Sequence, residues 1–181
     1  MDYRLVVTAA HCLPKLPPAH AAAVNSDKTY KLLGSLDGSK SGIWAECLFA
    51  NPVADIAVLD RPSDQELGDE ADAYAALTDD APVLRIDKAQ TGSGWVLALG
   101  SHWVRTTLTV FVSMGGGTSL SIDATEPGMS GSPILNDAGL AVGIVAVGTE
   151  RENKNGERRN ERTGPQPMLT RDLPGWLLDC K

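Results

Sequence analysis

The 181-residue sequence has no long apolar run and no dominant basic region. Its longest apolar stretches, VLALG and AVGIVAVG, are far too short to span a bilayer as a helix. The net charge of −7 and the lack of a basic patch argue against nucleic-acid binding. The first four residues, MDYR, lead directly into a strand-like run, so no signal peptide is visible. We therefore expect no nucleic-acid partner and no membrane partner.

Cysteine and histidine are both scarce. The chain has three of each: Cys12, Cys47 and Cys180, and His11, His20 and His102. An odd number of cysteines cannot all pair within one chain, so the sequence leaves their disulfide state open. The histidines lack the ligand spacing with cysteines that a zinc site needs, and His20 and His102 are expected at the surface. The sequence therefore predicts no metal and no cofactor.

What remains is a pattern of short apolar runs separated by turn residues. The chain is 43% hydrophobic and 22% charged, which is ordinary for a globular protein with a core. The runs predict strands at 4–9, 29–35, 43–50, 56–59, 83–86, 95–99, 106–113, 118–122, 132–135, 140–147 and 167–170. Many short strands at this spacing favour an all-β sandwich or barrel.

Three segments break the strand pattern. Residues 61–82 are acidic and alanine-rich, which predicts a linker with one or two helical turns around 67–77. Residues 150–164 carry charges of both signs and almost no apolar side chain, which predicts a solvated loop. The tail LPGWLLDCK predicts a short terminal helix that packs Trp176 and Leu177.

The stretch GMSGSP, residues 128–133, is the strongest candidate for chemistry. Glycines at positions −2 and +1 hold Ser130 on a tight turn, expose its hydroxyl and leave backbone N–H groups able to point at one spot. A serine hydroxyl is a poor nucleophile at neutral pH unless a base takes its proton. Histidine is the usual base, and a buried carboxylate must orient it.

His11 and Asp55 are the candidates for those two roles. His11 ends the run VVTAAH, where small residues allow close packing around an imidazole. Asp55 directly precedes the apolar run IAVL, and an aspartate there needs a hydrogen-bond partner such as a histidine N–H. Each residue alone is more often structural. Their occurrence with Ser130 in the chain order His, Asp, Ser favours a catalytic triad.

The motifs TAAHC, DIAVL and GMSGSP resemble the three active-site motifs of chymotrypsin-like (trypsin-like) serine peptidases, particularly bacterial members. GIVAVG resembles the family strand that lines the substrate cleft, and PMLTR followed by GWLL resembles the last strand and the terminal helix. The resemblance implies an all-β fold of two antiparallel six-stranded β-barrels with the site between them. Residues 1–75 would form the first barrel, and residues 76–181 the second barrel with a short C-terminal helix.

The resemblance also implies the role of each site residue. His11 would act as general base and then general acid, Asp55 would orient it, and Ser130 would attack the scissile carbonyl of a protein or peptide substrate. The backbone N–H groups of Gly128 and Ser130 would form the oxyanion hole. The substrate-binding positions would be Ala124, Thr125, Ala146, Val147, Gly148 and Pro167. Because these offer no carboxylate, we expect cleavage after uncharged, small to medium apolar side chains.

Two departures from the family pattern carry expectations of their own. Met129 stands where digestive members have an aspartate, so activation by a new N-terminal amine is not expected. Family members have a complete strand and a hairpin before TAAHC, whereas only seven residues, Met1–Val7, precede the threonine here. The first barrel is therefore expected to lack its first strand, and Cys12 to lack the partner that this hairpin supplies. By resemblance, a secreted or periplasmic location is favoured.

Two other functions fit parts of the sequence. The chain could be an inactive trypsin-fold binding module or a non-functional fragment, although such relatives usually lose His or Ser and this chain keeps both. An α/β-hydrolase esterase would need G-x-S-x-G and the order Ser, Asp, His. Ser132 replaces the last glycine of that motif and the order is different, which argues against an esterase.

Overall fold

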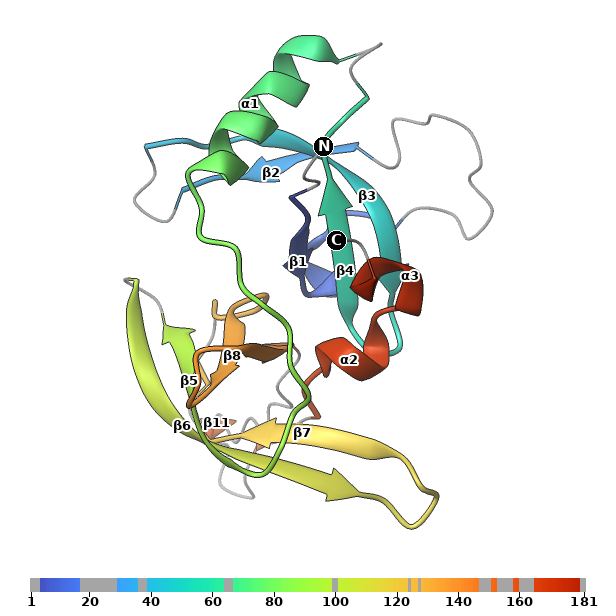
Figure 1. The fold of residues 1–181 in the computed structure, drawn as a ribbon, viewed down its shortest axis with the longest axis vertical. Helices are drawn as coiled ribbons and strands as arrows, with labels where there is room; N and C mark the ends of the chain where they lie inside the picture. The colour runs from blue at the N-terminus through green and yellow to red at the C-terminus, as the bar shows by residue number, and fades with distance from the viewer. Residues whose placement is uncertain are drawn as a thin grey trace.

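The computed structural model describes residues 4–16, 29–35, 39–63, 67–98, 101–123, 125–126, 128–146, 151–152, 158–159 and 165–179. Two antiparallel sheets form the two halves of the molecule, one in the upper and one in the lower part of Figure 1. The helices are few and short. The expected all-β class is therefore confirmed.

The first sheet has four strands in the order β1-β4-β3-β2. They are β1 (Val6–Thr8), β2 (Thr29–Leu33), β3 (Ile43–Asn51) and β4 (Ile56–Asp60). The apolar run of β4 is buried on both faces, which explains why it reads as continuous rather than alternating. Among the described residues no strand pairs with the outer edge of β1. This half is therefore an open, incomplete barrel, as expected.

The second sheet has five strands in the order β7-β6-β5-β8-β9. They are β5 (Gly92–Ala98), β6 (His102–Val112), β7 (Thr118–Ile122), β8 (Pro133–Asn136) and β9 (Ala141–Ile144). The segment 166–168 joins the two edges, because Gln166 bridges to Leu120 of β7 and Met168 bridges to Gly143 of β9. These bridges close the second sheet on itself.

The segment between the halves is more helical than expected. Helix α1 (Gly68–Asp79) has 12 residues, about three turns, whereas the sequence predicted one or two. Its buried side chains, Ala71, Tyr74 and Thr78, follow helical spacing and pack on the first sheet. The predicted domain boundary between residues 75 and 76 falls inside this helix.

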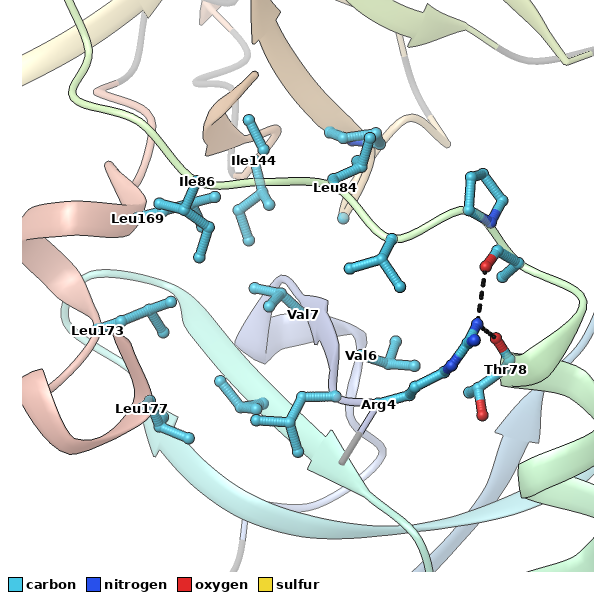
Figure 2. Close-up of a pocket in the computed structure, with 18 of the residues that line it drawn as sticks. Arg4, Val6, Val7, Thr78, Leu84, Ile86, Ile144, Leu169, Leu173 and Leu177 are labelled. Carbon is cyan, nitrogen blue, oxygen red and sulfur yellow. Dashed lines mark hydrogen bonds between the residues drawn. The ribbon is translucent and has the colours of Figure 1, made fainter. Parts of the chain in front are cut away.

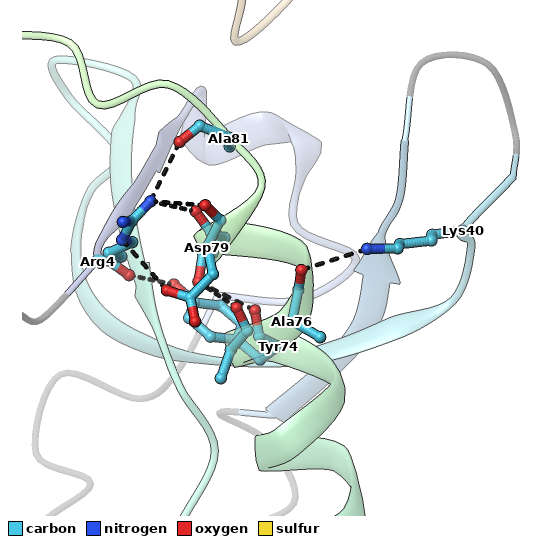
Figure 3. Close-up of polar contacts among 8 residues, drawn as sticks. Arg4, Lys40, Tyr74, Ala76, Asp79 and Ala81 are labelled. Atoms are coloured by element: carbon cyan, nitrogen blue, oxygen red, sulfur yellow. Dashed lines mark hydrogen bonds and ion pairs between the residues drawn. The ribbon is translucent and has the colours of Figure 1, made fainter.

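Arg4 anchors the C-terminal end of α1 to the start of β1 (Figure 3). Its Nη1 donates to the carbonyl oxygens of Thr78, Asp79 and Ala81 at 2.8, 3.2 and 3.2 Å. Its Nε also pairs with the Asp79 carboxylate at 3.3 Å. A cation here satisfies the last carbonyls of the helix and interacts favourably with its dipole.

Tyr74 and Lys40 fix α1 at two further points (Figure 3). The Tyr74 hydroxyl donates to the carbonyl oxygens of Arg4 at 2.9 Å and Leu59 at 3.2 Å, and burial raises the pKa of this phenol. Lys40 donates to the carbonyl oxygen of Ala76 at 3.2 Å. The helix is therefore tied to β1, to β4 and to the segment before β3.

Two of the predicted strands do not form. Residues 83–86 contribute one isolated bridge, from Ile86 to Ala141, and the side chains of Val83, Leu84 and Ile86 remain substantially exposed. Residues 167–170 give a bridge at Met168 and then turn into helix α2 (Leu169–Asp172). Both runs have apolar, strand-like sequences, but each bridges to β9 at a single residue and has no continuous strand partner, and strand pairing is a tertiary property.

The C-terminal tail and the charged tract also depart in part from expectation. The tail forms helix α3 (Gly175–Leu178), which buries Leu177 as predicted but leaves Trp176 54% exposed. Within 150–164, the described residues form two short paired strands, β10 (Arg151–Glu152) and β11 (Arg158–Arg159). The rest of this tract lies outside the described residues.

An apolar cluster holds the two halves together. It combines side chains of the first sheet, the second sheet and the C-terminal helices: Ala9, Ile56, Val58, Leu135, Ala141, Ile144, Leu169, Leu173 and Leu177. Removing this surface from water favours one fixed arrangement of the halves. Across the described ranges, no helix combines the length and apolarity needed to cross a membrane.

Candidate active site

His11 and Asp55 meet at one edge of the first sheet. His11 lies in a short 3-10 helix, η1 (Ala10–Cys12), directly after β1, and Asp55 ends the turn between β3 and β4. One carboxylate oxygen of Asp55 lies 2.7 Å from Nδ1 of His11, and the other accepts the backbone N–H of His11 at 2.9 Å. The two contacts fix both the ring and its backbone.

The turn that presents Asp55 is held in an unusual conformation. Asp55 has a φ of +57°, in the left-handed region that most side chains avoid and that Asp and Asn tolerate best. The Asn51 side chain accepts the backbone N–H groups of Val53 and Ala54 at 3.1 and 3.0 Å and so shapes the turn. Such conformations persist when their surroundings impose them, and they concentrate at functional sites.

The carboxylate also determines what the other ring nitrogen can do. A carboxylate beside Nδ1 favours the tautomer with the proton on Nδ1, which leaves Nε2 able to accept a proton. The His11 side chain is 40% exposed, whereas that of Asp55 is 16% exposed. Nε2 lies 3.9 Å from the Cys12 thiol, whose pKa is raised by partial burial, so the thiol stays neutral at neutral pH. The pair thus has the geometry of an oriented, accessible base.

Ser130 lies on a tight turn between two glycines. Gly128 and Gly131 have φ of +92° and +86°, values that only glycine adopts without strain. Ser132 donates its backbone N–H to the carbonyl of Met129 at 2.9 Å, and the Met129 side chain is buried beneath the turn. Met129 thus supports the turn by apolar packing and brings no negative charge to this position.

The same turn packs against the strand that leads to His11. A Cβ at Gly131 would lie 2.6 Å from Oγ1 of Thr8 and 3.6 Å from the backbone nitrogen of Ala9. Gly131 therefore allows the second half to approach the end of β1 within three residues of His11. No larger residue fits here without moving the turn.

The backbone of the turn offers two candidate donors. In the described part of the chain, no acceptor receives a hydrogen bond from the N–H of Gly128 or of Ser130. The neighbouring N–H groups of Met129 and Gly131 instead donate to Glu126 and Val145, at 3.2 and 2.7 Å. Backbone donors of this kind are what an oxyanion hole requires.

The structure therefore brings His11 and Asp55 into direct contact and packs Gly131, which follows Ser130, against Thr8, three residues before His11. Among the described residues, no hydrogen bond joins the Ser130 hydroxyl to His11. Hydrogen bonds of this type are often long in the absence of substrate and shorten when it binds.

The predicted substrate-binding residues are only partly described. Thr125 is half-buried, and Ala146 and Pro167 are buried. The segments that contain Ala146 and Pro167 are adjacent, since the Pro167 carbonyl accepts the backbone N–H of Ile144 at 3.3 Å. The other three predicted positions, Ala124, Val147 and Gly148, lie outside the described residues, as do His20 and Cys180.

Sequence reasoning missed one polar residue in this region. Gln166 is 1% exposed, and its side-chain oxygen accepts the backbone N–H of Ala146 at 2.6 Å. It lies in the run PQPM, where nothing in the sequence distinguishes it from a surface glutamine. Only the closure of the second sheet places it inside.

A cavity of about 620 Å³ between the halves is distinct from this site (Figure 2). Its lining is mainly aliphatic and includes Val6, Val7, Leu84, Ile144, Leu169 and Leu173. Gly131 lines it, whereas His11, Asp55 and Ser130 do not. Arg4 borders it but is bound to main-chain carbonyls, so no acid or base in its described lining could take part in catalysis.

The described residues include no cluster of three or more His, Cys, Asp or Glu that could hold a metal ion. Cys12 is exposed and free, and Cys47 is buried with its thiol directed to the carbonyl of Phe49 at 3.5 Å.

Comparison with known proteins gives one family match and several similar structures. Residues 2–144 match the family model described as the trypsin-like peptidase domain. Among solved structures, the chain is similar to the MamO protease domain from Magnetospirillum magneticum in its apo form, with TM-score 0.48 and 14% identity, covering 94% of this chain and 82% of that one. It is also similar to the Rv3671c protease in an inactive form, with TM-score 0.43 and 18% identity, covering 81% of this chain and 68% of that one. No curated protein matches the chain.

The family match covers most of the 181 residues and includes the whole of GMSGSP, DIAVL and TAAHC. It agrees with an all-β fold of two antiparallel sheets joined by a short apolar interface. The chain belongs to the trypsin-like peptidase domain family.

Proposed function

We propose that the protein is a serine endopeptidase in which His11, Asp55 and Ser130 act as a catalytic triad. The observation that carries this proposal is that Asp55 contacts His11 twice, at 2.7 Å from Nδ1 and by accepting the backbone N–H at 2.9 Å, while the glycine-flanked serine turn packs against the end of β1. A structural histidine needs only one partner. Here one carboxylate fixes both the ring and the backbone, and the second ring nitrogen remains accessible.

The steps follow from the position of each group. His11 takes the proton of the Ser130 hydroxyl as the serine oxygen attacks the scissile carbonyl, and Asp55 stabilises the imidazolium that forms. The N–H groups of Gly128 and Ser130 stabilise the negative charge on the carbonyl oxygen. His11 then donates its proton to the leaving amine, and water hydrolyses the acyl-enzyme through the same base.

Covalent labelling with a fluorophosphonate probe tests this proposal. A serine reacts with the probe at a useful rate only when a neighbouring base activates it. We expect the folded protein to be labelled at Ser130, and the label to disappear in the heat-denatured protein and in Ser130→Ala. Ser132→Ala is the matched control, because Ser132 lies two residues away on the same turn, and it should retain labelling at Ser130. Failure of the folded wild-type protein to label would favour the inactive binding module.

The residues proposed to bind substrate carry no charge. Thr125, Ala146 and Pro167 have apolar or hydroxyl side chains, and the carbonyl of Val145, directly before Ala146, accepts the backbone N–H of Gly131. We therefore expect cleavage after small to medium uncharged apolar residues, because a buried charge without a partner would be costly. A peptide-library cleavage profile measures this preference. A profile dominated by Arg, Lys or Glu at that position would contradict it.

A further inference from the structure

Gln166 is a fully buried polar side chain within the largely apolar core of the second half. It is 1% exposed, and its neighbours in the core include Leu120, Val145 and Met168. Its backbone N–H donates to the carbonyl of Leu120 at 2.6 Å, which fixes its position on β7. Burying a carboxamide is unfavourable unless it is hydrogen-bonded, so the hydrogen bonds of Gln166 indicate its structural role.

The side-chain oxygen Oε1 of Gln166 accepts a hydrogen bond from the backbone N–H of Ala146, with 2.6 Å between oxygen and nitrogen. The same peptide unit also contains the carbonyl of Val145. This carbonyl accepts the backbone N–H of Gly131 at 2.7 Å. Because a peptide unit is planar and its C=O and N–H point in opposite directions, holding one end sets the direction of the other.

The Val145–Ala146 peptide is thus held between Gln166 and the turn that carries Ser130. The backbone N–H of Val145 also donates to the carbonyl of Ser132 at 2.9 Å, so Val145 is hydrogen-bonded to both Gly131 and Ser132. Gly131 in turn packs against Thr8 at the end of β1. A chain of direct contacts therefore runs from Gln166 to the point where the two halves meet beside His11.

We propose that Gln166 is a positioning residue that holds the Val145–Ala146 peptide in place. This peptide in turn holds Gly131, and so keeps the neighbouring Ser130 correctly placed relative to His11. This inference rests on the proposed function, since it assigns Gln166 a role in presenting the nucleophile. Gln166 touches neither the nucleophile nor the base. Its effect passes through one peptide plane and one hydrogen bond to Gly131.

Two substitutions separate positioning from general stability. Gln166→Met has a similar length but replaces the amide oxygen by a thioether, which is only a weak acceptor, so the N–H of Ala146 loses its strong partner. Gln166→Glu keeps an oxygen at the same place in either protonation state. We expect kcat and the rate of fluorophosphonate labelling to fall about 10- to 100-fold in Gln166→Met, with KM little changed, because small displacements of reacting groups have effects of this size. Gln166→Glu should retain most of the wild-type rate.

A stability control uses Arg4→Met. This variant loses three hydrogen bonds to main-chain carbonyls at the C-terminal end of α1, none of which belongs to the chain of contacts from Gln166 to Gly131, so its melting temperature should fall while its kcat and labelling rate remain those of the wild type. All rates are measured well below the lowest melting temperature of the set. Equal kcat and labelling rates in Gln166→Met and the wild type would overturn the proposal and leave Gln166 a purely structural residue.

Hydrogen exchange gives a readout that does not depend on activity. We expect the Gly131 amide to exchange at least about tenfold faster in Gln166→Met than in the wild type, because its acceptor is no longer held in place. The amides of β4 should change much less, and Arg4→Met should not affect Gly131 selectively. Unchanged exchange at Gly131 would overturn the inference even if the wild-type protein is labelled. A wild-type protein that does not label would instead contradict the proposed function, and exchange at Gly131 would still test the contact.

Discussion

Replacing His11 by alanine is expected to lower kcat by a factor on the order of 10⁴ to 10⁶, with little change in KM. The imidazole is the only base for which the structure supplies an orienting carboxylate beside the Ser130 turn within the described residues, and it would transfer the proton in both halves of the reaction. Because the side chain is 40% exposed, its removal leaves no large cavity in the core. Steady-state hydrolysis of a peptide substrate, together with a melting curve, measures both effects.

His102→Ala is the matched control for this prediction. His102 is exposed at the start of β6 and is remote in sequence from every proposed catalytic residue, so its loss should leave kcat unchanged. A second check uses the double variant His11→Ala with Ser130→Ala. Groups that act as one unit are strongly non-additive, so the double variant should be no slower than the slower single variant. Multiplicative losses would show that the two residues do not act together.

Asp55→Asn is expected to lower kcat by about 10⁴ at neutral pH while the protein keeps its fold. An amide carries no negative charge and can present its NH2 group as well as its oxygen to Nδ1, so it no longer imposes the proton on Nδ1 and no longer stabilises the imidazolium. Asparagine also tolerates the left-handed backbone at φ +57°, whereas alanine would add strain there. The substitution therefore changes the charge at His11 and preserves the turn.

Labelling rate, kcat and melting temperature together test the Asp55 prediction. Asp69→Asn serves as a control of the same chemistry, because Asp69 is exposed in the first turn of α1 and far along the chain from His11. We expect the control to keep the wild-type kcat. If Asp55→Asn retains a kcat within tenfold of the wild type, Asp55 has a structural role in the turn rather than a role in catalysis.

The cavity between the halves and the proposed active site are different places in the molecule. A large, apolar cavity is the usual first candidate for a ligand site. Here the cavity of about 620 Å³ contains no available acid or base in its described lining, whereas His11, Asp55 and Ser130 lie outside it. The hydrogen bonds of Asp55, rather than the size of a cavity, identify the site to be tested.

Much of the β architecture could be predicted from local patterns. The apolar run of β4 and the turns that separate the strands depend on neighbouring residues, so they are visible in the sequence. The glycines around Ser130 are equally local, because the turn needs positive φ at Gly128 and Gly131. The order of the His11, Asp55 and Ser130 motifs likewise indicates the family from the sequence alone.

The remaining features depend on residues that are distant in the chain. Residues 83–86 have the composition of a strand but lack a strand neighbour along most of their length, and α1 is longer than predicted because Tyr74 and Arg4 secure it to the first sheet. The double contact between Asp55 and His11 spans 44 residues, and the hydrogen bond that Ala146 donates to Gln166 spans 20. Local sequence sets backbone preferences and turns, whereas these long-range hydrogen bonds arise only when distant segments pack together within each half. The sequence by itself therefore determined which groups are available, and the tertiary structure decided which of them meet.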